Sequence, residues 1–372
     1  EHYGNASSRV PAHGRKAREG VEAARAQVAA LIGASGEEII FTSGATESDN
    51  LALLGTASGR ELDGKHVVSV CTEHKAVLDS LSVLERRGWR VTRLPVDSDG
   101  MLAIADLEAA LTEDTSLVSV MLANNEVGVV QDLAAVAALT RPRGITLHCD
   151  AAQGLGYLPL SVRELPIDLL SMSAHKMYGP KGVGALYVRR SLQTRGLPLP
   201  QMHGGGHQAG LRSGTLDVPG IVGMGAAADL MLQHGTEEAS QLADLRDQLQ
   251  ARLVEALDQV RVNGSTTHRH PGNLNVSFGY VDGAALLLAV CETVSVSSGS
   301  ACSSATTEPS YVLEAMGVDG EWAKASIRFG LGRSTTPRDV MIAADAVIAA
   351  VTKLRAESPA WRAREDGETV DW

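Results

Sequence analysis

The sequence predicts an α/β protein with a large, mostly parallel sheet flanked by helices and a smaller α+β domain at its C-terminal end. Short β-branched runs alternate with stretches of helical period through the first two thirds of the chain, which is the pattern of βαβ units. The 372 residues exceed the usual size of one hydrophobic core. At about Thr236 the alternation of short apolar runs and helical stretches gives way to a long charged stretch of helical period. We therefore expect a large domain over residues 1–235 and a small domain over 236–372.

The expected strands are short apolar runs, and the expected helices lie between them. In the large domain the strands are Ile39 to Thr42, Val67 to Val70, Val91 to Leu94, Leu117 to Leu122, Ile145 to Cys149, Leu169 to Met172 and Ala185 to Val188. The helices are Ala76 to Arg87, Ile104 to Leu111 and Leu133 to Thr140. The small domain should contain a charged helix, two strands and a C-terminal helix, which are Glu237 to Leu257, Asn273 to Phe278, Val294 to Val296 and Pro337 to Leu354.

Charge and hydropathy exclude several classes of partner. The formal net charge is −11 and no block of basic residues occurs, so direct binding to nucleic acid or to an anionic membrane is not expected. No apolar run approaches the length that crosses a bilayer. The chain opens at Glu1 with no initiator Met and no signal-peptide pattern, and we expect a soluble protein that acts on small molecules and proteins.

The four cysteines are far apart and form no C-x-x-C pair, so neither a metal site nor a disulfide framework is expected. Cys149 lies in an expected strand and Cys291 follows an apolar stretch, so both are expected in the core, while Cys71 ends a strand. Cys302 differs, because it lies in a run of Ser, Gly, Ala and Thr without a bulky anchor. Such a segment should be mobile and exposed.

Polar residues follow directly after several expected strands. The clusters are Thr42 to Glu47, Thr72 to His74, Asn124 to Glu126, Asp150 to Gln153 and Ser173 to Lys176. The carboxyl ends of parallel strands lie at one edge of a sheet, where ligands of open α/β sheets bind. One such cluster could be a helix cap or a turn, but five together predict one ligand-binding edge.

The residue types in these clusters suit pyridoxal phosphate. Ser43, Gly44 and Thr46 open an expected helix, whose N–H groups and hydroxyls suit a phosphate. Asp150 ends an apolar strand, where a buried carboxylate needs a cationic N–H partner such as a protonated pyridine nitrogen. Lys176 lies in a Gly- and Ala-rich turn, where a partly desolvated lysine can form a Schiff base. These three features are what pyridoxal phosphate requires.

Seven motifs closely resemble those of the cysteine desulfurases of iron–sulfur cluster assembly. They are T-S-G-A-T-E-S-D-N (42–50), T-E-H-K-A-V (72–77), N-N-E-V-G (124–128), D-A-A-Q (150–153), S-A-H-K-M-Y-G-P-K-G (173–182), R-S-G-T (212–215) and S-S-G-S-A-C-S-S (297–304). The resemblance runs over the whole chain, and S-S-G-S-A-C is similar to the long-loop group of that family. It implies an aminotransferase-like fold and pyridoxal 5′-phosphate as cofactor.

The resemblance also implies a role for each residue of the cofactor site. Lys176 would hold the cofactor and move protons, Asp150 would pair with the pyridine nitrogen, and Gln153 would bind the ring hydroxyl. His74 would stack on the ring. The implied phosphate ligands are Ala45, Thr46, Ser173 and His175, together with Thr215 from the neighbouring subunit of a homodimer.

The implied reaction is the conversion of L-cysteine to L-alanine. Asn125 and Arg328 would hold the substrate carboxylate, and Cys302 would take the sulfur as a persulfide. The implied partners are an iron–sulfur scaffold protein and other sulfur acceptors, in the bacterial cytoplasm or the mitochondrial matrix. A selenocysteine lyase, an ordinary aminotransferase of the same fold and a catalytically silent scaffold subunit remain alternatives. Without the resemblance, Arg328, His74 and Thr215 could each be structural.

Overall fold

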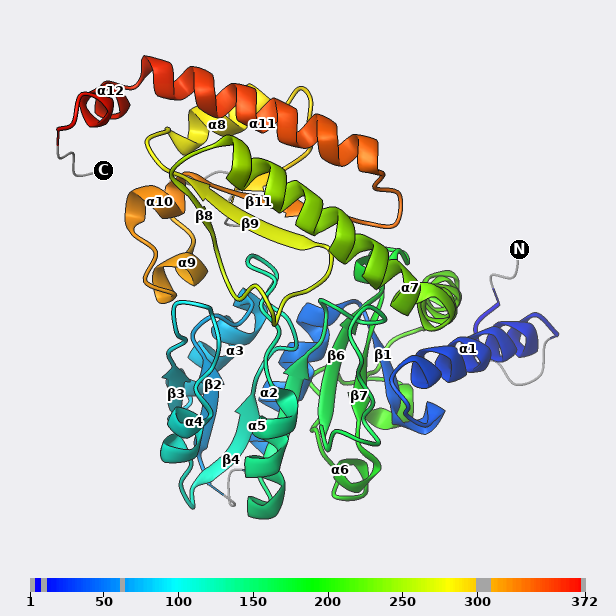
Figure 1. Ribbon diagram of the computed structural model, residues 1–372. Coiled ribbons are helices and arrows are strands. Elements are labelled where there is room, and N and C mark those ends of the chain that lie inside the picture. The colour runs from blue at the N-terminus through cyan, green and yellow to red at the C-terminus, as the bar shows by residue number, and fades with distance from the viewer. Residues whose placement is uncertain (1–3, 8–11, 61–63, 299–308, 369–372) are drawn as a thin grey trace. The chain divides into compact units, whose positions relative to one another are not determined.

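Seven strands form one sheet in the order β1-β7-β6-β5-β4-β2-β3 in the computed structural model, which describes residues 4–7, 12–60, 64–298 and 309–368 (Figure 1). They are β1 (Ile39–Thr42), β2 (His66–Val70), β3 (Arg90–Leu94), β4 (Thr115–Ser119), β5 (Thr146–Asp150), β6 (Leu169–Ser173) and β7 (Gly184–Val188). Only β7 runs antiparallel to its neighbours β1 and β6, and the other pairs are parallel. Strands β1 to β6 therefore end at one edge, and the expected large, mostly parallel sheet is confirmed.

Helices cover both faces of this sheet. α2 (Ala45–Gly59) and α3 (Lys75–Arg86) pack together on one face, and α4 (Ile104–Ala110) and α5 (Leu133–Thr140) pack together on the other (Figure 1). This division follows from right-handed crossovers between parallel strands. Two further α-helices precede α7 in the described part of the chain. They are α1 (Ala12–Leu31) and α6 (Arg190–Thr194). The inner strands are buried along their whole length, as in sheets covered on both faces.

The long helix α7 spans Val218–Ala256, whereas the sequence predicted a helix only from Glu237. The missed first half contains several glycines, which lower helix propensity by about 1 kcal/mol each. Gly225 shows why a glycine is tolerated there. A Cβ at this position would lie 2.5 Å from the Cα atom of Ala24 in α1, so packing between these helices requires a residue without a side chain. Although α7 has 39 residues, none of the described helices is long and apolar enough to span a bilayer.

The chain divides into two units, and two short segments of its first part belong to the second unit. Unit 1 comprises Glu1–Leu94, Leu102–Leu122 and Gln131–Thr236. Unit 2 comprises Pro95–Met101, Ala123–Val130 and Glu237–Trp372. The segment that carries Asn125 is therefore part of unit 2, although it follows β4 in the sequence.

Unit 2 contains an antiparallel sheet in the order β10-β11-β9-β8. Its elements are β8 (Val260–Val262), β9 (Asn273–Phe278), β10 (Ser297–Ser298), β11 (Ser326–Gly330), α8 (Gly283–Val290), α9 (Tyr311–Ala315), α10 (Gly320–Lys324), α11 (Pro337–Glu357) and α12 (Pro359–Glu365). The expected strand Val294 to Val296 is wrong. The Val294 N–H donates to the Val290 carbonyl, which continues the helical turn that ends α8.

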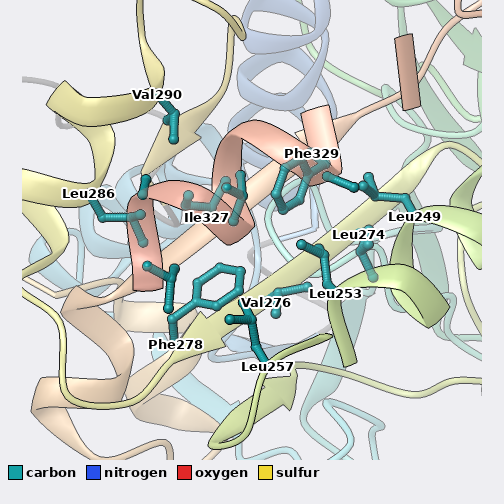
Figure 2. Close-up of a cluster of buried hydrophobic side chains, with 14 of the residues drawn as sticks. Leu249, Leu253, Leu257, Leu274, Val276, Phe278, Leu286, Val290, Ile327 and Phe329 are labelled. Carbon is teal, nitrogen blue, oxygen red and sulfur yellow. The ribbon is translucent and has the colours of Figure 1, made fainter. Parts of the chain in front are cut away.

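The core of unit 2 lies between this sheet and its helices. Apolar side chains of β9 and β11 meet leucines of α7 and residues of α8 (Figure 2). Phe278 is a fully buried member of this cluster. Alternate residues of β9 point into it, since Leu274, Val276 and Phe278 all belong to the cluster.

Substitution of Phe278 with alanine should lower the free energy of unfolding by about 3–5 kcal/mol, because it removes a buried ring and leaves a cavity. Urea unfolding of the full-length protein, followed by circular dichroism, measures this loss. Leu288→Ala is the matched control, since the Leu288 side chain is 73% exposed and its loss should change stability by less than about 0.5 kcal/mol. Equal losses in both variants would contradict this placement of the core.

Candidate active site

Four of the five polar clusters lie at the carboxyl edge of the unit 1 sheet. They follow β1, β2, β5 and β6, which all end at that edge. The fifth cluster, Asn124 to Glu126, belongs to unit 2. The expected convergence of strand ends therefore holds for these four clusters.

The N-terminus of α2 is shaped to bind an anion. Gly44 is the residue before the helix, and Ala45 and Thr46 are its first two residues. The first N–H groups of a helix have no partner within it, and the helix dipole favours a negative ligand there. Strand β7 passes so closely that a Cβ on Gly184 would lie 2.6 Å from the Cα atom of Gly44, which keeps side chains out of this corner.

A short 3₁₀ turn, Ala174–Met177, follows β6 and presents two more polar side chains. Ser173 Oγ and His175 Nδ1 lie 2.8 Å apart and share a hydrogen bond. Burial, followed by the charges of Lys176 and Lys181, lowers the pKa of His175, so its imidazole is neutral at neutral pH. His175 and Lys176 are both exposed at this edge, where a ligand can reach them.

His74 begins α3. Its Nδ1 accepts a hydrogen bond from the Ala76 N–H at 3.1 Å, so the neutral ring carries its proton on Nε2. This contact caps the helix and fixes the orientation of the imidazole at the sheet edge. The structural reading of His74 as a cap is therefore correct, and it is compatible with a ring that stacks on a ligand.

Asp150 ends β5 with its side chain buried. Its Oδ1 accepts a hydrogen bond from the Ala152 N–H at 2.8 Å. Burial and the nearby Asp49 carboxylate raise the pKa of Asp150 to about 7, while the Ala152 N–H and the imidazoles of His148 and His74 lower it in part. A cationic N–H group at this position would stabilise the ionised carboxylate.

Three further buried titratable residues lie near Asp150, and sequence analysis assigned a role to none of them. They are Asp49 in α2, Glu73 after β2 and His148 in β5. His148 precedes Asp150 by two residues, so both lie on the same face of β5. That spacing could have indicated the buried polar cluster from the sequence, because a histidine inside an apolar strand needs polar neighbours.

The remaining cofactor residues expected from the sequence are less enclosed. Gln153 is half-buried three residues after Asp150, and Thr215 is exposed in the segment that precedes α7. Arg212, in the same R-S-G-T motif, makes an ion pair with Glu47 of α2, with 2.7 Å between Nε and Oε1. This contact holds the segment near Thr215 against the start of α2.

Unit 2 brings Asn125 and Arg328 together. The Arg328 guanidinium donates from Nη1 to the Asn125 carbonyl at 2.7 Å and from Nε to Ser297 Oγ at 3.1 Å. These two bonds fix the orientation of the guanidinium. A planar guanidinium held in this way suits a carboxylate.

Cys302 lies outside the described residues. Of the other cysteines, Cys149 is buried as expected, but the expected burial of Cys291 is wrong. Cys291 follows the last residue of α8 and is exposed, and its thiol donates to the Leu288 carbonyl. A helix end faces solvent even when the preceding residues are apolar, so the apolar stretch was a poor guide to its burial.

Comparisons with known proteins relate this chain to a family. Residues 1–342 match the model of the class-V aminotransferases. The cysteine desulfurase IscS of Anaeromyxobacter sp. (strain Fw109-5) is 54% identical, over all of this chain and 92% of its own length. IscS of Neisseria meningitidis serogroup A is 50% identical with the same coverage.

Solved structures agree with these sequence relationships. A NifS-like protein superposes with a TM-score of 0.87 at 36% identity, over 95% of this chain and 93% of its own. SspA, solved in complex with cysteine, superposes with a TM-score of 0.78 at 34% identity, over 89% of this chain and 91% of its own.

Proposed function

The chain belongs to the class-V aminotransferases and, within them, to the cysteine desulfurases, and from this premise we propose that it converts L-cysteine to L-alanine and keeps the sulfur as a persulfide. The cofactor of this class is pyridoxal 5′-phosphate. The observation that supports the proposal best is a buried Asp150 at the same sheet edge as Lys176 and the N-terminus of α2. This edge offers a carboxylate, an amine and an anion site, which fit the pyridine nitrogen, the aldehyde and the phosphate of that cofactor.

Each residue of the edge has one proposed task toward the cofactor. Lys176 holds it covalently, Asp150 keeps its ring nitrogen protonated, and Gln153 binds its ring hydroxyl. His74 packs on the ring face, and its cap to α3 keeps the imidazole in place. The proposed phosphate ligands are Ala45, Thr46, Ser173 and His175. When bound, the cofactor supplies a ring that accepts electrons from the substrate Cα.

The substrate is proposed to be held through its carboxylate by Arg328 and Asn125. The Lys176 amine would remove the substrate Cα proton and later return it. The Cys302 thiolate attacks the substrate sulfur, so an S–S bond forms while the Cβ–S bond breaks and its electron pair stays with the carbon. Cβ gains a proton, Cα regains the proton held by Lys176, alanine leaves, and the sulfur stays on Cys302.

Arg328→Lys should raise the KM for L-cysteine by about 10- to 100-fold, because a lysine cannot make the charge-assisted bonds of a planar guanidinium. Initial rates of alanine release over a range of cysteine concentrations measure this change. Arg333→Lys is the control, since Arg333 makes an ion pair with Glu238, and its KM should stay at the wild-type value. An unchanged KM in Arg328→Lys would remove Arg328 from the substrate site.

The proposal extends to assembly and partners. Thr215 is exposed next to the Arg212–Glu47 ion pair, and we assign it to the phosphate site of a second subunit in a homodimer. The persulfide is proposed to pass to an iron–sulfur scaffold protein and other acceptors. The test of the function is alanine release from L-cysteine and from L-selenocysteine. Alanine from L-selenocysteine alone would assign a lyase, and none from either would assign a silent subunit.

A further inference from the structure

Polar side chains of three neighbouring strands lie next to one another on the face of the sheet that α2 covers. The middle one, His148, precedes Asp150 by two residues in β5. His148 of β5 lies between Ser119 of β4, whose Oγ is 2.9 Å from Nδ1, and Ser171 of β6, whose Oγ is 3.0 Å from Nε2. Asp49 approaches these side chains from α2, with its Oδ1 atom 3.5 Å from His148 Nε2. The side chains of Asp49 and His148 are fully buried.

Asp49 lacks the contacts that usually stabilise a buried carboxylate. Among the described residues, neither of its oxygens has a donor in hydrogen-bond geometry. Burial raises the pKa of Asp49 to about 7, and the nearby Ser171 hydroxyl lowers it only in part. An unpaired buried charge of this kind is costly, and such groups take up a proton instead.

His148 does not supply the missing positive charge. Burial lowers the pKa of His148 to about 4, against a smaller opposing effect of Asp150, so its ring is neutral at neutral pH. The two serine hydroxyls at its nitrogens satisfy a neutral ring. The contact between Asp49 and His148 is therefore not an ion pair.

Glu73 is the third carboxyl of this cluster. Its Oε1 accepts a hydrogen bond from the Met121 N–H at 2.6 Å. Burial, followed by the charge of Asp150, raises the pKa of Glu73 well above its ordinary value, and the charge of Asp49 acts in the same direction. Asp49 and Asp150 are the two carboxyls of this cluster whose pKa is raised to about 7, and Asp150 lies near the charge of Asp49 and the imidazoles of His148 and His74.

We propose that Asp49 and Asp150 hold one proton in common when the cofactor is absent, and that the protonated ring nitrogen of the cofactor displaces this proton. Two neighbouring buried carboxyls do not both ionise without a cation. The arriving N–H cation takes the place of the proton, which leaves to the buffer. The cluster then carries the same net charge with and without cofactor, and both carboxyls are ionised together only when the N–H cation is bound. Asp49 is therefore a positioning residue that acts through Asp150.

The experiment counts protons when the full-length protein, freed of its cofactor, binds pyridoxine 5′-phosphate, which lacks the aldehyde and cannot react with Lys176. Isothermal titration calorimetry at pH 7 in buffers of different ionisation enthalpy gives this number. Wild type should release up to about one proton more per bound molecule than Asp49→Asn, because an amide at this position cannot store the proton. Protonation of the ligand itself contributes equally to both proteins.

The matched control is Glu73→Gln, an identical change of carboxyl to amide in the same cluster. It should release as many protons as wild type, because the proposal places the released proton on Asp49 and Asp150 and not on Glu73. If Asp49→Asn does not fold, Asp49→Ser takes its place, since a serine side chain cannot store the proton either. Equal release by wild type and the Asp49 variant would overturn the proposal.

This inference rests on the proposed role of Asp150 toward the ring nitrogen. The variant Asp150→Asn tests that role separately from the shared proton. If Asp150 faces the ring nitrogen, Asp150→Asn should weaken binding of pyridoxine 5′-phosphate at least about tenfold. Weakened binding together with equal proton release in wild type and Asp49→Asn would leave the role of Asp150 intact and refute the shared proton. Unchanged binding in Asp150→Asn would refute the role of Asp150 itself.

Discussion

Replacement of Lys176 with alanine is expected to abolish the covalent bond to the cofactor and to reduce alanine release by about 10³-fold or more. A positioned amine that moves the Cα proton contributes on that order to catalysis, and no other side chain proposed for this edge is an amine. The purified variant should lose the visible absorbance of the wild type. Borohydride reduction followed by peptide mapping should find cofactor on the Lys176 peptide of the wild type and on no peptide of the variant.

Lys181→Ala is the control for that experiment. Lys181 is also exposed and lies in the same glycine-rich segment, five positions further along the chain, but no role in the cofactor site is proposed for it. Its variant should keep both the absorbance and the reduced Lys176 adduct. A lysine adduct that persists in Lys176→Ala would show that another lysine holds the cofactor.

Cys302→Ser is expected to separate cofactor chemistry from sulfur chemistry. The visible spectrum and cysteine binding should stay close to wild type, because Cys302 has no proposed contact with the ring, the phosphate or the substrate carboxylate. Persulfide formation should decrease by orders of magnitude, roughly 10³-fold, since a serine hydroxyl is far less ionised and far less nucleophilic toward sulfur than a thiol. Rapid-quench measurement of alanine and of protein-bound sulfur tests both halves.

The control for this substitution is Cys291→Ser. Cys291 is exposed at the end of α8, so it is accessible to reagents that trap persulfides. Its loss should leave alanine release unchanged and affect stability by no more than an ordinary point change, about 0.5–3 kcal/mol. Loss of activity in Cys291→Ser, together with full activity in Cys302→Ser, would show that Cys291 and not Cys302 takes the sulfur.

The sheet and the polar clusters at its carboxyl edge could be predicted from the sequence because each depends on local signals. Strands such as β5 are continuous apolar runs, and polar residues such as Asp150 stand where those runs end. The antiparallel direction of β7 is not encoded in this way, since a buried strand has the same composition in either direction. The first half of α7 was missed because it contains several glycines, of which Gly225 allows the close contact with α1.

The residues behind Asp150 were missed for a different reason. Asp49 lies in the motif of residues 42–50, of which sequence analysis assigned only Ser43, Gly44, Ala45 and Thr46 to phosphate binding, and nothing local distinguishes it from an exposed helix residue. Its burial and its approach to His148 arise only when α2 packs on the sheet. Tertiary burial, and not residue type, therefore identifies the carboxyl that can share a proton with Asp150.

The most direct test of the proposed function is the location of sulfur after a single turnover. Wild-type protein loaded with cofactor would receive one equivalent of L-cysteine, and alkylated peptides would then be analysed by mass spectrometry. The account predicts one alanine released for each persulfide, with the persulfide on the peptide that contains Cys302. A persulfide on Cys71 or Cys291, or alanine released without any protein persulfide, would contradict it.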